Sequence, residues 1–176
     1  MTRVSTGSVR DARPPEMLVR TTNPLVRSIV RSPLGRLTPA LAVVDHVGRR
    51  SGHRRRVVVG WHELDGRAFV VTPAVWRANF SGGAPARVHQ HGRTRSMRGT
   101  LVSDAALVAD VLATFFAAGG SPASCGLRIE ADHPIDAHDV EIVGRSIVWF
   151  DPEACLTARQ GWVTQRARRA RRRCRE

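Results

Sequence analysis

The chain has 176 residues, 42% of them hydrophobic, which suits one globular domain with a sizeable core and argues against wholesale disorder. Its formal net charge of +13 favours anionic partners, whether nucleic acid, anionic lipid or an anionic cofactor. No apolar run approaches the roughly 20 residues of a membrane-spanning helix, and no hydrophobic stretch follows the first charged residues as in a secretory signal. We therefore expect a cytoplasmic protein.

The first part of the chain combines a polar segment with an amphipathic one. We expect residues 1–20 to be flexible. Residues 24–37 predict a short helix, because Leu25 and Ile29 share one side while Arg27 lies on the other. Such a helix either packs on the rest of the protein or rests on a membrane surface, which would place the protein at the inner face of the membrane.

The middle of the chain reads as about six strands joined by short connections, which favours antiparallel pairing. Asp65-Gly66 and His91-Gly92 are turn signals between strands, and residues 75–80 predict one or two helical turns. The expected strands are residues 41–47, 54–61, 68–72, 86–90, 95–102 and 146–150.

One longer helix is predicted from Ser103, as its N-cap, to about Ala118, with Gly119-Gly120 as its stop. Its predicted apolar face consists of Leu107, Val108, Val111, Leu112 and Phe115. Residues 126–143 read as irregular. The pattern predicts an α+β fold, a small antiparallel β-barrel with packed helices over residues 21–152, followed by an arginine-rich tail over residues 153–176.

The first segment with chemical content runs from Gly48 to Arg55 with the sequence GRRSGHRR, between two predicted strands. Two glycines permit a tight turn with converging N–H groups, and Ser51 and the arginines add hydrogen-bond donors and charge. A phosphate or carboxylate needs such a site, although a solvated charged hairpin has the same composition.

The second segment follows the third predicted strand and contains Trp76 and Asn79, three residues apart and so on one helical face. They offer an aromatic surface and an amide to a ligand. As structural residues, Trp76 would anchor the core and Asn79 would cap a turn.

Together these segments resemble the deazaflavin-dependent nitroreductase family, over residues 24–152. The resemblance is carried, in order, by Gly48-Arg49-Arg50-Ser51-Gly52, Arg55, Trp76 with Asn79, Gly82-Gly83-Ala84-Pro85, Arg98-Gly99-Thr100 and Gly144-Arg145. It implies a split β-barrel of the FMN-binding type, with a groove for the deazaflavin coenzyme F-420, whose tail carries a phosphate and several glutamates.

The resemblance also implies positions for the cofactor. The anionic tail would meet Arg49, Arg50, Ser51, Gly52 and Arg55, and Val58 and Val59 would lie along the groove. Thr72, Pro73 and Ala74 would present backbone to the deazaflavin ring, with Trp76 and Asn79 nearby. The expected activity is hydride transfer between the deazaflavin and an organic acceptor such as a quinone, a nitro compound or an activated alkene.

The chain departs from the family in two ways: its route from Thr72 to Trp76 is short, and it has no tyrosine. Characterised nitro-reducing members place a tyrosine near the substrate, so the catalytic residues are left open here. Two alternatives therefore remain, namely the same barrel with FMN, and a non-catalytic barrel that carries a cofactor or a lipid. The protein would be a monomer or a homodimer.

Other signals are assigned to structure or solvent. His89 and His91 would share one face of a strand but lack a third metal ligand. Residues 132–141, rich in Asp and His, read as a solvated loop, and the three cysteines show neither metal nor disulfide spacing. The arginine tail could contact anionic lipid or nucleic acid, but nucleic acid is disfavoured because no reading module accompanies it.

Overall fold

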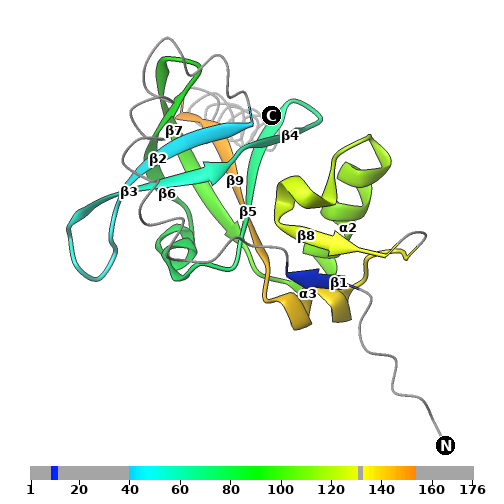
Figure 1. The fold of residues 1–176 in the computed structure, drawn as a ribbon. Helices are drawn as coiled ribbons and strands as arrows, with labels where there is room; N and C mark the ends of the chain where they lie inside the picture. Colours follow the sequence, from blue (N-terminus) through cyan, green and yellow to red (C-terminus); the bar gives the residue numbers. More distant parts are fainter. Residues whose placement is uncertain (1–8, 12–39, 131–132, 154–176) are drawn as a thin grey trace, which may run out of the picture.

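The main feature of the fold is a curled antiparallel sheet of seven strands (Figure 1). The computed structural model describes residues 9–11, 40–130 and 133–153. The strands of the sheet are β2 (Leu41–Val47), β3 (Arg54–Gly60), β4 (His62–Leu64), β5 (Arg67–Thr72), β6 (Ala84–Gln90), β7 (Arg93–Val102) and β9 (Ser146–Pro152). Their order is β3-β2-β6-β7-β9-β5-β4, and the curl gives the sheet the form of a half-barrel. The expected α+β class is therefore confirmed.

The hairpins follow from local turn chemistry. Asp65 and Gly66 have φ values of 51° and 73°, and His91 and Gly92 have 51° and 72°, the backbone that two-residue hairpin turns require. Both turn predictions are confirmed. However, Asp65-Gly66 joins β5 to the short β4, whereas β3 lies at the opposite edge of the sheet.

The concave face of the sheet buries one hydrophobic cluster, which we call the inner core. Alternate residues of each strand point into it, as the period of a strand requires. Its fully or nearly fully buried members include Ala42, Val44, Val70, Phe80, Val88, Met97, Val148 and Phe150. Trp61 closes the cluster near the sheet edge, with its ring centroid 5.4 Å from that of Phe150.

A second layer covers the convex face over β5 and β9 (Figure 1). It consists of α2 (Ala105–Ala117), η3 (Pro122–Cys125), β8 (Leu127–Ile129), α3 (Ala137–Val143) and β1 (Val9–Asp11). The intervening residues of β5 and β9, Phe69 and Ile147, pack against Val108 and Leu112 of α2 in what we call the outer core. One sheet thus separates two cores.

The predicted helix was nearly right in extent but not in detail. Asp104, not Ser103, is the N-cap, because its side chain accepts a hydrogen bond from the Leu107 amide at 2.9 Å. Leu107, expected on the buried face, is 55% exposed. Ala109, which was not expected there, is buried instead. Apolar character alone placed Leu107 wrongly, since a helix also leaves some leucines in solvent.

Several short elements were not predicted, among them β4 and η3. Residues 126–143 contain β8 and α3, and Val9–Asp11, in the segment expected to be flexible, forms β1 antiparallel to β8. Strands of three residues are too short to show alternation. Arg145 helps to hold this pair: its buried guanidinium donates to Asp11 Oδ1 at 2.9 Å and to the Gly126 carbonyl at 2.7 Å.

Two predicted segments lie outside the described residues, namely the amphipathic helix at 24–37 and, apart from Glu153, the arginine-rich tail at 153–176. Among the residues that the structure does describe, no helix combines the length and the apolar character needed to cross a membrane.

The outer core contains a histidine that makes stability depend on pH. His62 packs against Phe69 and Phe115, with ring centroids 5.3 and 5.2 Å away, and burial lowers its pKa below 6.5. The unfolded chain then binds more protons than the folded one below about pH 6.5. We expect the free energy of unfolding to fall between pH 7.5 and 5.5, and His62→Phe to reduce that fall. Urea denaturation at both pH values measures it; an unchanged fall in His62→Phe would contradict it.

Candidate functional site

The predicted basic turn is built as a closed loop between β2 and β3. The Gly48 amide donates to the His53 carbonyl at 2.9 Å, and the Gly52 amide donates to the Gly48 carbonyl at 2.8 Å. Gly52 has φ +66°, and a Cβ on Gly48 would lie 2.5 Å from Ser51 Oγ, so both positions suit glycine. The side chains of Arg49, Arg50 and Ser51 are exposed at the tip.

The turn satisfies several of its own amide groups, which changes how it could hold an anion. We expected converging backbone N–H groups, but those of Gly48 and Gly52 bind carbonyls of the turn, and that of His53 approaches Ser51 Oγ at 3.4 Å. The guanidinium groups of Arg49 and Arg50 are therefore the main anion ligands that the turn offers.

The second predicted segment forms the 3₁₀ helix η2 (Val75–Phe80), which leads from β5 to β6. Its last residue, Phe80, is fully buried in the inner core, and the half-buried Trp76 packs against it with ring centroids 5.9 Å apart. Val75, by contrast, is 90% exposed. The aromatic pair fixes η2 at the end of the half-barrel.

A hydrogen bond joins the two segments. The Arg49 amide donates to Asn79 Oδ1 at 2.8 Å, and Asn79 Nδ2 donates to the Trp76 carbonyl at 2.8 Å. Asn79 thus links the basic turn to η2 across 30 residues of sequence. With both ends of its amide engaged, it acts here as a structural link rather than as a free ligand-binding group.

Gly99 on β7 makes room for this arrangement. A Cβ at this position would lie 2.4 Å from Phe80 Cδ1 and 3.0 Å from Phe150 Cε1. The Phe80 ring therefore occupies the space that any other side chain at position 99 would fill. Arg98 supports the same region from the neighbouring position, where it donates to the Gly83 carbonyl at 3.1 Å.

The remaining expected cofactor residues do not share one surface. Val59 is buried in the inner core, whereas Val58, adjacent on the strand, faces the other side of the sheet. Because neighbouring strand residues alternate, at most one of these two can line a given groove. Arg55 lies on the same face as Val59, directly opposite His46 in the β2–β3 pairing.

The polar groups of residues 72–74 form hydrogen bonds with one another and with Arg77. Thr72 Oγ1 accepts from the Ala74 amide at 3.1 Å, and the Arg77 side chain donates to the carbonyls of Pro73 and Ala74. The backbone offered to a flat ring at this point is thus already bound to Arg77. A ligand there would contact it through apolar surface or would displace the arginine.

His46 is the residue of this region that sequence reasoning missed. It is only 4% exposed, and its ring lies 5.8 Å from that of Trp76 and 5.5 Å from that of Phe80. Burial lowers the pKa of His46 and is the largest cause of the shift. The Val44 backbone opposes it, Arg55 lowers the pKa further by a smaller amount, and Asp45 raises it slightly. A single histidine in an apolar strand gives no pattern that could have revealed this position.

A cavity of about 210 Å³ opens where β2 and β6 stop pairing. The two strands pair from Val43 to Asp45 only, although β2 continues to Val47 and β6 begins at Ala84. The polar residues around the cavity are Asp45, His46, Arg54, Arg87, Ser96 and Glu153. The basic turn, η2, His46 and this cavity together form the candidate site.

The histidines weighed as metal ligands have other roles. His89 Nδ1 lies 2.8 Å from Thr94 Oγ1 and its Nε2 lies 3.3 Å from Asp45 Oδ2, while His91 is in the turn rather than on the same strand face. Across the described part of the chain, no group of three or more His, Cys, Asp or Glu side chains is arranged to hold a metal.

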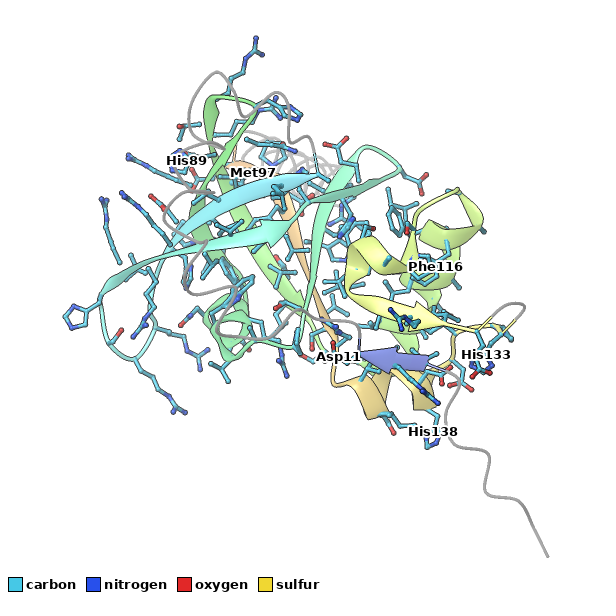
Figure 2. The ribbon with its side chains drawn as sticks, in the orientation of Figure 1. Asp11, His89, Met97, Phe116, His133 and His138 are labelled. Atoms are coloured by element: carbon cyan, nitrogen blue, oxygen red, sulfur yellow. The ribbon has the colours of Figure 1, made fainter. Side chains whose placement is uncertain are left out.

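The Asp- and His-rich stretch builds a helix end rather than a solvated loop. Asp136 caps α3 by accepting from the Asp139 amide at 2.9 Å, and Asp139 Oδ2 lies 2.7 Å from His133 Nε2. His133 and His138 lie on the α3 side of the molecule, away from His89 (Figure 2).

Cys125 is buried in the outer core, and burial raises its pKa to about 11, which makes it an inert thiol.

No protein-family model matches this chain, and a search of the curated proteins finds no relative.

The link through Asn79 can be tested directly. In Asn79→Ala the Arg49 amide and the Trp76 carbonyl lose their partners, so we expect the free energy of unfolding to fall by about 1–2 kcal/mol and hydrogen exchange at the Arg49 amide to accelerate. Asn79→Asp keeps an acceptor for Arg49 and should protect that amide. Urea denaturation and amide exchange measure both effects; equal exchange rates in the wild type and Asn79→Ala would contradict the link.

Proposed function

We propose that this protein binds coenzyme F-420 and acts as a deazaflavin-dependent oxidoreductase. It would transfer a hydride between the deazaflavin and an organic acceptor, with a quinone, a nitro compound or an activated alkene as the classes to test. The proposal includes the finer fold that the family resemblance implies, in which the curled sheet is one half of a split β-barrel.

The observation that carries the proposal is the hydrogen bond from Arg49 to Asn79. The two segments that carry the resemblance are far apart in sequence, yet this bond makes the turn with its exposed arginines a neighbour of η2, which carries Trp76. A cofactor with a flat ring and an anionic tail needs both kinds of surface within one site. Arg98-Gly99-Thr100 is a third segment of the resemblance, and the close contact of Gly99 with Phe80 gives a physical reason for glycine there.

The arginines of the site suit the anionic tail of such a cofactor in charge, although the expected residues do not all share one surface. Arg49, Arg50 and Arg55 would bind phosphate and glutamate carboxylates, and Ser51 would donate a hydroxyl hydrogen bond. Trp76 would contact the ring system. When bound, the deazaflavin supplies the hydride, while the chain supplies position and excludes water.

The proposal predicts a specific pattern of affinity. Purified protein titrated with coenzyme F-420, followed by fluorescence, should bind it saturably and more tightly than FMN, whose single phosphate leaves much of the basic turn unused. Arg50→Ala and Arg55→Ala should each weaken binding about tenfold, equivalent to about 1.4 kcal/mol, because each removes a charged hydrogen-bond donor. Arg128→Ala, an exposed arginine on β8, is the matched control and should bind normally.

The outcomes separate the candidate functions. Failure to bind at tens of micromolar, roughly −6 to −7 kcal/mol, would overturn the cofactor assignment. Tighter binding of FMN would favour the FMN enzyme. Saturable binding of coenzyme F-420 without oxidation of its reduced form by any acceptor class would leave a carrier protein in place of an oxidoreductase.

A further inference from the structure

The most unusual polar group in the described residues is the imidazole of His46. Its side chain is buried at the end of the inner core, and neither Nδ1 nor Nε2 has a hydrogen-bond partner. The Val44 backbone lies close enough to affect the pKa of the ring but does not meet hydrogen-bond geometry. Buried polar groups in proteins are nearly always paired, so this one calls for an explanation.

Packing alone does not explain the choice of histidine at position 46. The ring packs against both Trp76 and Phe80, at centroid distances of 5.8 and 5.5 Å, where a phenylalanine would fill a similar space without two unsatisfied nitrogens. Natural proteins retain locally unfavourable groups chiefly where function requires them. The ring is therefore a candidate for contact with something that binds.

The charges around the ring favour its neutral form. Arg55 faces it from β3, Asp45 precedes it on β2, and η2 presents only the uncharged Trp76 and Phe80. Burial disfavours the imidazolium ion most and Arg55 adds to this, while the Val44 backbone and Asp45 oppose it; the net effect lowers the pKa of His46. A neutral imidazole has one N–H donor and one bare nitrogen acceptor.

His46 is one of the residues that line a cavity at the end of the sheet. His46 lies just beyond the last β2–β6 pair, Asp45 with Arg87, and lines the cavity of about 210 Å³ that opens there. It also lies two residues before Gly48, where the basic turn begins. A ligand in this cavity would lie next to the turn, and it would reach a ring nitrogen by a rotation of the imidazole toward the cavity, since both nitrogens are buried.

We propose that His46 is the residue that hydrogen-bonds the heterocycle of the bound cofactor, with its N–H donated to a ring carbonyl or its bare nitrogen accepting from a ring N–H. This inference rests on the proposed function, because the deazaflavin is the planar ligand with ring carbonyl and ring N–H groups that the site would hold. The arginines bind the tail, and His46 fixes the ring.

The test compares two buried histidines. His46→Phe removes both nitrogens from the site, and His62→Phe removes them from the outer core, where His62 packs against Phe69 and Phe115. We expect His46→Phe to keep or raise the melting temperature, yet to weaken binding of coenzyme F-420 at least tenfold. His62→Phe should leave the affinity within about twofold of wild type, because His62 packs in the outer core with Phe69 and Phe115 and not at the candidate site.

A second variant and a spectroscopic measurement keep the proposal testable if His46→Phe does not fold. His46→Gln keeps a donor and an acceptor and should retain more affinity than His46→Phe. With ring-¹⁵N-labelled protein, the His46 signal, which is the one that His46→Gln lacks among the seven histidines, should move on addition of coenzyme F-420.

Each outcome decides between the inferences. If the wild type binds the coenzyme and His46→Phe binds it equally well, or if the His46 ring signal does not move, the role of His46 is overturned while the proposed function stands. If the wild type does not bind the coenzyme, the proposed function fails and this inference fails with it.

Discussion

The burial of Phe80 against Gly99 is the contact on which the candidate site depends. Phe80 lies at the end of η2, fully buried, with the Phe150 ring 5.5 Å away, and Gly99 leaves the space that its ring fills. Because this contact fixes η2 against the sheet, Trp76 and Asn79 take defined positions, and the Asn79 amide can hold the basic turn. Packing in the inner core thus determines where Asn79 holds the exposed basic turn.

Local sequence patterns predicted the parts of the fold that have local causes. The strand at residues 41–47 and the turns at Asp65-Gly66 and His91-Gly92 follow from alternation and from backbone preferences that neighbouring residues set. The pairing of β1 with β8 depends on contacts between distant segments, which no local pattern contains. The same reason hid the position of β4 at the far edge of the sheet.

The sequence predicted which segments take part in the candidate site, but not how their side chains and backbone groups are arranged. Both segments that the sequence marked do meet, through Arg49 and Asn79, but the turn uses much of its own backbone, and Val58 and Val59 face opposite sides. His46 could not be predicted, since its significance lies in unpaired nitrogens and aromatic neighbours that only the folded chain brings together. Polar groups without partners are a feature of structure, not of composition.

The most direct test of the central claim is to map where coenzyme F-420 contacts the protein. In ¹⁵N-labelled protein titrated with the coenzyme, the backbone amide signals of residues 48–53 and of η2 should shift together, while those of α2 and α3 stay in place. Such a pattern would show that the basic turn and η2 form one binding site. Shifts confined to the α2–α3 side of the sheet, or no shifts at saturating coenzyme, would contradict it.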